Sequence, residues 1–151
     1  MNSRYSLIAV RWAIATALLV SFGCGSGEYQ LVPVSGTVTL DGDPVVGARV
    51  IFEPQRTDKQ ALSAGPSSDG KTDDQGRYSL QTTAAGKRGA IAGPHSVVIT
   101  TFQAELDRTR ETSNVIRKEE IPQRYRDVGG LTYVVPPEGS DAADFQLQSR
   151  P

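Results

Sequence analysis

Two residues could be centres of chemistry in this sequence, because each is the only one of its type: His95 and Cys24. A single imidazole excludes any mechanism that needs two histidines. A single cysteine excludes a disulfide within the chain and a multi-cysteine zinc site. Ser96 is adjacent to His95, and neighbouring residues of a strand point to opposite faces. The pattern therefore predicts a structural role for His95 and a protein without catalytic activity.

Acidic residues form two small groups, at residues 41–43 and 69–74. A calcium loop needs several oxygens that converge from one segment, with a spacing such as D-x-[DN]-x-[DN]-G. Asp41-Gly42-Asp43 stops after two acids, and a proline follows. Nothing in the pattern positions two acids for glycoside hydrolysis. We therefore expect turns here, with no metal ion and no cofactor.

Five residues are predicted to shape these turns. Aspartate side chains accept hydrogen bonds from nearby backbone N–H groups, and glycine adopts the left-handed conformation that other residues avoid. A tyrosine after the second turn restarts a strand and is expected to face inward. These predicted structural turn residues are Asp41, Gly42, Asp73, Gly76 and Tyr78.

The first residues are typical of an export signal. Arg4 and Arg11 give a positive start, and no acidic residue occurs in this segment. The apolar run at residues 12–22 has the length of a signal peptide and is short for a transmembrane helix. It leads to Cys24, which lies among small residues as in the lipobox of bacterial lipoproteins.

We therefore expect residues 1–23 to be a lipoprotein signal peptide, Cys24 to carry the lipid and residues 24–33 to form a tether. The predicted location is the bacterial cell envelope, on the periplasmic side or at the surface, with the membrane bound through the N-terminal lipid. Two or three acyl chains would anchor the protein stably. The alternative is ordinary secretory cleavage near Gly23 or Gly27, which leaves Cys24 without lipid.

Short β-prone segments separated by turn residues follow this tether, and 15 glycines and 9 prolines fit a turn-rich β protein. Residues 103–120 are highly charged, and we expect a mobile polar insertion there, with a short helical turn over 104–111 as the alternative. The pattern predicts one all-β domain at residues 34–148, a seven-stranded β-sandwich. Its expected strands are residues 34–40, 46–52, 71–72, 77–82, 95–102, 131–135 and 144–147.

Three motifs in this order resemble the carboxypeptidase regulatory-like domains. The segment at residues 34–52 is similar to their opening strands, and Thr72-Asp-Asp-Gln-Gly-Arg-Tyr78 is similar to their "TDxxGxY" turn. Residues 93–99 resemble their "GxYxVxV" strand, with His95 where an aromatic residue is usual. The resemblance implies a transthyretin-like (prealbumin-like) Greek-key sandwich. The C-terminal segment, from Ile121 to Leu147, resembles the small planctomycete-type lipoproteins that carry this domain.

The function expected from these features is a non-catalytic, lipid-anchored module of the cell envelope that interacts with a protein or serves as a scaffold. The alternative is an envelope-glycan binding module, whose exposed aromatic residues would be Tyr29 and Tyr133. An uncharacterised hydrolase is the third possibility. The formal net charge of −1 and the scattered basic residues argue against nucleic-acid binding. The sequence does not specify the oligomeric state.

Overall fold

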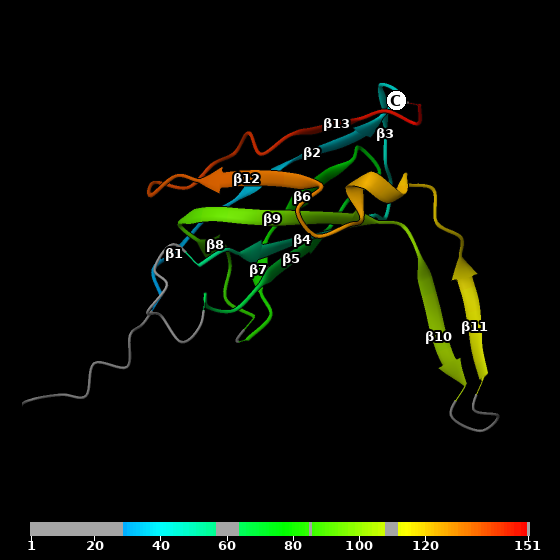
Figure 1. Cartoon of the computed structure of the whole chain (residues 1–151), viewed down its shortest axis with the longest axis horizontal. Helices are drawn as coiled ribbons and strands as arrows, with labels where there is room; N and C mark the ends of the chain where they lie inside the picture. Colours follow the sequence, from blue (N-terminus) through cyan, green and yellow to red (C-terminus); the bar gives the residue numbers. More distant parts are fainter. Residues whose placement is uncertain (1–28, 57–63, 85, 108–111, 151) are drawn as a thin grey trace, which may run out of the picture.

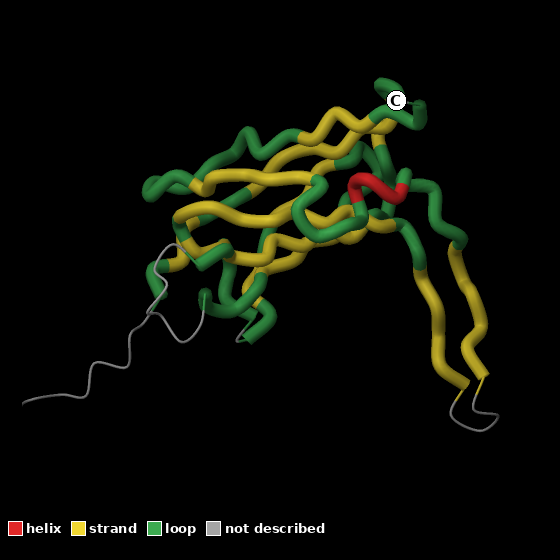
Figure 2. The backbone as a smooth tube through the Cα atoms, in the orientation of Figure 1, coloured by secondary structure: helices red, strands yellow, loops and turns green. Residues whose placement is uncertain are grey.

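The computed structural model describes residues 29–56, 64–84, 86–107 and 112–150. The predicted signal peptide and Cys24 lie outside these residues. The described chain forms an all-β sandwich, as predicted, from which one long hairpin projects (Figure 1). Strands and loops account for nearly all of it (Figure 2).

The sandwich has two main sheets. In the antiparallel five-stranded sheet the order is β12 (Leu131–Val135), β9 (Gly93–Thr100), β4 (Arg49–Pro54), β5 (Ser68–Lys71) and β7 (Gln81–Thr82). The second sheet is built around β2 (Ser35–Leu40), which pairs with β13 (Phe145–Leu147) in parallel and with β3 (Asp43–Pro44) and β6 (Arg77–Ser79) antiparallel.

The hydrophobic core lies between the inner faces of the two sheets. Phe52 of β4 is fully buried, and its ring centroid lies 6.1 Å from that of Phe145 and 6.5 Å from that of Tyr78, both from the other sheet. Alternate residues of β4 and β9 also point inward, among them Val50 and Ile99. This alternation is why the period-two segments of the sequence become strands.

The structure contains more and shorter strands than the seven expected. The segment predicted as one strand at residues 77–82 is divided at Leu80, so that β6 belongs to one sheet and β7 to the other. Leu80 and Tyr78 are both buried, as expected.

The predicted tether at residues 24–33 includes β1 (Leu31–Val32), which pairs with β8 (Ala90–Ile91), and Val32 is 5% exposed. The folded part therefore begins before the predicted boundary at Val34.

The charged segment at residues 103–120 also differs from the expectation. Neither an irregular insertion nor a helical turn forms in its described part, because β10 (Gln103–Asp107) and β11 (Thr112–Arg117) pair antiparallel. A register shift between Gln103 and Ala104 marks a bulge in this pair. The two strands form a separate sheet, which we call the arm. The arm projects away from the sandwich (Figure 1).

A short 3-10 helix, η1 (Gln123–Tyr125), follows the arm and leads back to the sandwich. Ile121, just before it, is 2% exposed and joins the core. In the residues that the structure describes, no helix is long and apolar enough to cross a membrane.

Candidate interaction surface

Asp73 organises the turn between β5 and β6. Its Oδ1 accepts hydrogen bonds from the backbone N–H groups of Gln75 and Arg77, both at 2.9 Å. Its Oδ2 lies 3.1 Å from the Arg77 Nε. The bonds from Arg77 and Gln75 stabilise the carboxylate and lower the pKa of Asp73. The side chain is engaged within its own turn, which is a structural role.

Gly76 and Tyr78 connect this turn to the second sheet. Gly76 has φ +73°, and a Cβ there would lie 2.6 Å from the Val38 carbonyl oxygen. The buried Tyr78 donates its hydroxyl to the Ala143 carbonyl at 2.7 Å. Burial raises the pKa of the Tyr78 phenol well above its usual range. Both residues hold β6 against β2 and the segment before β13.

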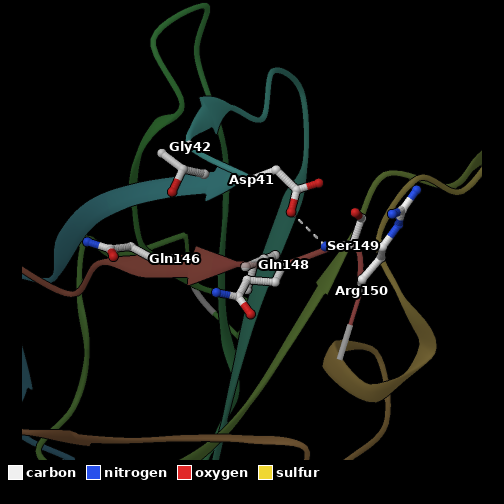
Figure 3. A pocket seen from close by; sticks show the side chains of 8 residues that line it. Asp41, Gly42, Gln146, Gln148, Ser149 and Arg150 are labelled. Atoms are coloured by element: carbon white, nitrogen blue, oxygen red, sulfur yellow. Dashed lines mark hydrogen bonds between the residues drawn. The ribbon is translucent and has the colours of Figure 1, made fainter.

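Asp41 and Gly42 form the turn between β2 and β3, at the edge of an open polar pocket of about 990 Å³ (Figure 3). Asp41 has φ 55° and accepts a hydrogen bond from the Ser149 N–H at 2.9 Å. Hydrogen bonding from Ser149 lowers the pKa of Asp41. The described lining includes no aromatic residue; it consists of Thr39, Asp41, Gly42, Gln146, Leu147, Gln148, Ser149 and Arg150.

His95 is a core residue of β9 and is 1% exposed. Its ring lies 5.6 Å from the Phe52 ring, and its Nδ1 lies 3.0 Å from the Gly93 carbonyl oxygen. Burial lowers the pKa of His95, and the bond to Gly93 opposes this only partly. Ser96, also buried, accepts a hydrogen bond from the Gly129 N–H at 2.7 Å. The imidazole therefore occupies the kind of position that an aromatic ring would fill.

The tyrosines considered for sugar stacking are not equivalent. Tyr29 is 44% exposed. Tyr133, expected to be exposed, instead packs edge-on against Phe52 and Phe145, and its hydroxyl lies 2.9 Å from the Ser140 Oγ. The expectation for Tyr133 is wrong because it shares the inward face of β12 with the buried Val135. Tyr133 is partly buried, so it offers a sugar ring a smaller stacking platform than an exposed aromatic residue would.

No metal centre is found in the described residues, where no group of three or more His, Cys, Asp or Glu side chains could hold an ion. Asp43 is exposed in the short strand β3. Asp69 lies on β5 and forms an ion pair with Arg49 at 2.7 Å. The second acidic group thus splits between a strand and a turn.

The root of the arm is fixed to the sandwich from both strands. Gln103 of β10 donates from Nε2 to the Gly47 carbonyl at 3.2 Å, and Arg117 of β11 donates from Nη1 to the Val46 carbonyl. Gln103 and Arg117 are themselves a cross-strand pair. Arg117 also forms an ion pair with Glu120 at 2.8 Å. The arm therefore leaves the sandwich in a defined direction.

Gly47 permits this attachment. It has φ +68°, and a Cβ there would lie 3.0 Å from the Arg117 Nη1. The group that packs closely against this glycine is the guanidinium at the root of the arm.

Glu119 secures the chain where it returns from the arm. Its carboxylate accepts hydrogen bonds from the Thr100 hydroxyl and from the backbone N–H groups of Thr101 and Ile121, the last two at 3.0 and 2.9 Å. Burial raises the pKa of Glu119, but these hydrogen bonds outweigh it and lower the pKa to about 2. Thr100 ends β9 and Thr101 follows it, so this one carboxylate joins the strand before the arm to the segment after it.

A groove of about 740 Å³ lies between the arm and the outer face of the five-stranded sheet. The sheet contributes Arg49, Asp69 and Lys71 to its lining, and the arm contributes Glu105 and Ile116. The groove is open to solvent, and its lining includes both positively and negatively charged side chains.

Large apolar side chains are exposed on and beside the arm. Ile116 is 64% exposed, Val115 54% and Phe102 49%. Exposed apolar groups that cluster on one element are typical of interaction surfaces, whereas scattered ones need no explanation. The arm and this groove together form the candidate interaction surface.

Sequence reasoning did not identify this surface. Its signal was present in the β-branched residues Thr112, Val115 and Ile116. The charged residues around them favoured an irregular segment, because a hairpin exposed on both faces has no apolar alternation.

No protein-family model and no curated protein matches the sequence. Among solved structures, the chain is similar to a 9R-lipoxygenase from Cyanothece PCC8801, with 12% identity and a TM-score of 0.37. The match covers 79% of this chain and 16% of the lipoxygenase. A likeness at this TM-score carries no argument about fold or activity. The class defined by the fold itself is an all-β sandwich with a projecting hairpin.

Proposed function

We propose that the protein is a non-catalytic interaction module of the bacterial cell envelope, held at a membrane by lipid on Cys24. It binds a protein partner through the arm. The observation that carries this proposal is the arm, a hairpin with exposed apolar residues whose root is fixed by Gln103 and Arg117. A fixed binding element loses less conformational entropy on association than a flexible one.

The sequence supports the envelope part of the proposal. The positive start, the apolar run and the single cysteine among small residues fit a lipoprotein signal. The resemblance to carboxypeptidase regulatory-like domains agrees with an accessory role. A transthyretin-like sandwich with this resemblance is the fold within the all-β class that we propose.

The positions of the polar groups favour binding over catalysis. The imidazole of His95 is buried, and Asp41 and Asp73 hold turns within the fold. Glycan binding has less support, because Tyr133 is partly buried against the core and the pocket beside Asp41 offers no described aromatic side chain.

Labelling with palmitate and membrane fractionation test the anchor, with the wild type compared with Cys24→Ser. Label and membrane retention should both disappear in the variant. An unlabelled wild type that stays out of the membrane fraction would overturn the anchor.

Site-specific photocrosslinking of the full chain in its native bacterium tests binding through the arm. A photoreactive residue at Ile116 is compared with one at Val134, which is 69% exposed on β12 and pairs with Pro94, at the opposite end of β9 from the arm. An adduct formed from position 116 alone supports the proposal. Equal adducts from both positions, or none, would contradict it.

A further inference from the structure

The outer strand of the arm, β11, has one edge that no other described strand covers. Among the described strands β11 pairs with β10 alone. It lies on the side of the arm away from the sandwich (Figure 1). Ser113, Asn114, Val115 and Ile116 are all exposed. An edge strand presents unpaired backbone N–H and C=O groups to any further strand that can align with it.

The two edges of the arm are protected differently. Proteins usually block an exposed edge with charged residues or proline. On β10, Glu105 carries a negative charge beside the groove. On β11, the residues from Ser113 to Ile116 carry no charge, and Val115 and Ile116 are apolar. The edge of β11 is therefore suited to pairing, and the edge of β10 is less so.

We infer that β11 pairs antiparallel with β11 of a second copy of this chain, so that two arms join in one four-stranded sheet. This inference rests on the proposed function, because it names the partner that the arm binds. It commits to a partner of the same sequence and to one strand edge.

Symmetry restricts how the two strands can align. A two-fold axis relates identical strands in such a pair, so one residue must lie opposite its own copy. With Val115 at the axis, the two valines meet, Asn114 faces Ile116 and Ser113 faces Arg117. This alignment places no like charges opposite each other. Pairing of β10 with its own copy at Glu105 would place two carboxylates opposite each other, which is unfavourable.

The environment of the protein favours such pairing. The root of the arm is fixed at Gln103 and Arg117, so the strand is presented in one direction. Copies held at one membrane by lipid have a raised effective concentration, and a short strand pair then suffices for association.

A charge exchange at Val115 tests the inference. Two differently tagged copies of the full chain are produced together, and their co-purification from detergent-solubilised membranes is measured. Val115→Glu in both copies, or Val115→Lys in both, should reduce co-purification about tenfold, because like charges then meet at the axis. One copy with Val115→Glu and the other with Val115→Lys should restore it. This restoration also shows that both variants fold.

The same substitutions at Val134 are the matched control, since this exposed valine lies on β12, an edge strand of the sandwich. They should leave co-purification unchanged. The inference would be overturned if the Val134 variants changed co-purification, or if the Val115 variants left it unchanged. Copies that never co-purify would also overturn it. In that case an adduct from Ile116 with a different protein would leave the proposed function standing, whereas no adduct would overturn both.

Discussion

The carboxylate of Glu119 accepts two hydrogen bonds from Thr101, one from the backbone N–H at 3.0 Å and one from the hydroxyl at 2.8 Å. Thr101 is fully buried and immediately follows β9, and Glu119 follows β11. The contact therefore joins the two ends of the arm at the sandwich. The orientation of the arm depends on the carboxyl group of Glu119 staying ionised.

Acid should weaken the protein through Glu119. Its pKa falls from 4.5 to about 2 on folding, so the unfolded state binds the proton more tightly. The stabilisation is fully present above about pH 5 and is lost as the pH falls towards 2. Glu119→Gln should lower the free energy of unfolding at pH 7 by about 2 kcal/mol. Urea denaturation at pH 7 and pH 3 measures both effects.

Glu120→Gln is the control for this experiment, because Glu120 forms only an exposed ion pair with Arg117 among its described side-chain contacts. Its effect should stay below about 1 kcal/mol. Equal losses for Glu119→Gln and Glu120→Gln would show that the hydrogen bonds of Glu119 do not secure the arm.

Loss of the Tyr78 hydroxyl should destabilise the sandwich without a change of shape. Tyr78→Phe removes the donor to the Ala143 carbonyl and leaves that oxygen without this buried bond. We expect the free energy of unfolding to fall by about 1.5 kcal/mol. Tyr133→Phe, which removes a part-buried bond to Ser140, should cost less, about 0.5 kcal/mol. Chemical denaturation followed by circular dichroism compares them, and a reversed order would contradict the role given to Tyr78.

The strands that sequence reasoning found share one physical feature, a single buried face. Val38 in β2 and Val135 in β12 are buried, and burial alternates along both strands. The residues of β2 also alternate between apolar and polar, whereas β12 carries the exposed Val134 beside Val135. The same alternation could have shown that Tyr133 points inward, since it lies two residues before Val135. It could not show that residues 77–82 change sheets at Leu80. Leu80 would be buried whether the chain stayed in one sheet or crossed to the other, so its burial does not reveal the crossing.

The arm could not be predicted from the sequence because, unlike those strands, it has no buried face. Its described residues bury little, so pairing between β10 and β11 leaves no apolar period to detect. The bonds from Gln103 to Gly47 and from Arg117 to Val46 join positions 56 and 71 residues apart. Contacts at such separations depend on the whole topology and leave no local pattern.

Two glycines in predicted turns should respond differently to alanine. Gly42 has φ +97°, and nothing lies within 4 Å of a Cβ built there, so Gly42→Ala carries only the backbone cost of about 1 kcal/mol. Gly76 has φ +73°, and its Cβ would also collide with the Val38 carbonyl oxygen. Gly76→Ala should cost about 3 kcal/mol or more. Thermal unfolding of both variants measures this difference, and equal shifts would refute the close approach at Gly76.

His95 should make the protein less stable in mild acid. Burial lowers the pKa of His95 below its usual 6.5, so the unfolded state binds a proton more readily than the folded state. The contribution of neutral His95 to the free energy of unfolding is therefore fully present above about pH 7, and it decreases as the pH falls through 6.5 and below. This decrease should be measurable at pH 5.5, where Glu119 is still ionised in both states.

His95→Phe should remove most of this pH dependence, because the phenyl ring can pack against Phe52 and has no proton to bind. The variant loses the contact between the ring and the Gly93 carbonyl, so its stability at pH 7.5 should not exceed that of the wild type. The informative quantity is the change in melting temperature between pH 7.5 and pH 5.5, measured for both proteins. An identical change in the two would mean that His95 does not titrate on unfolding, and the buried position of its imidazole would then be wrong.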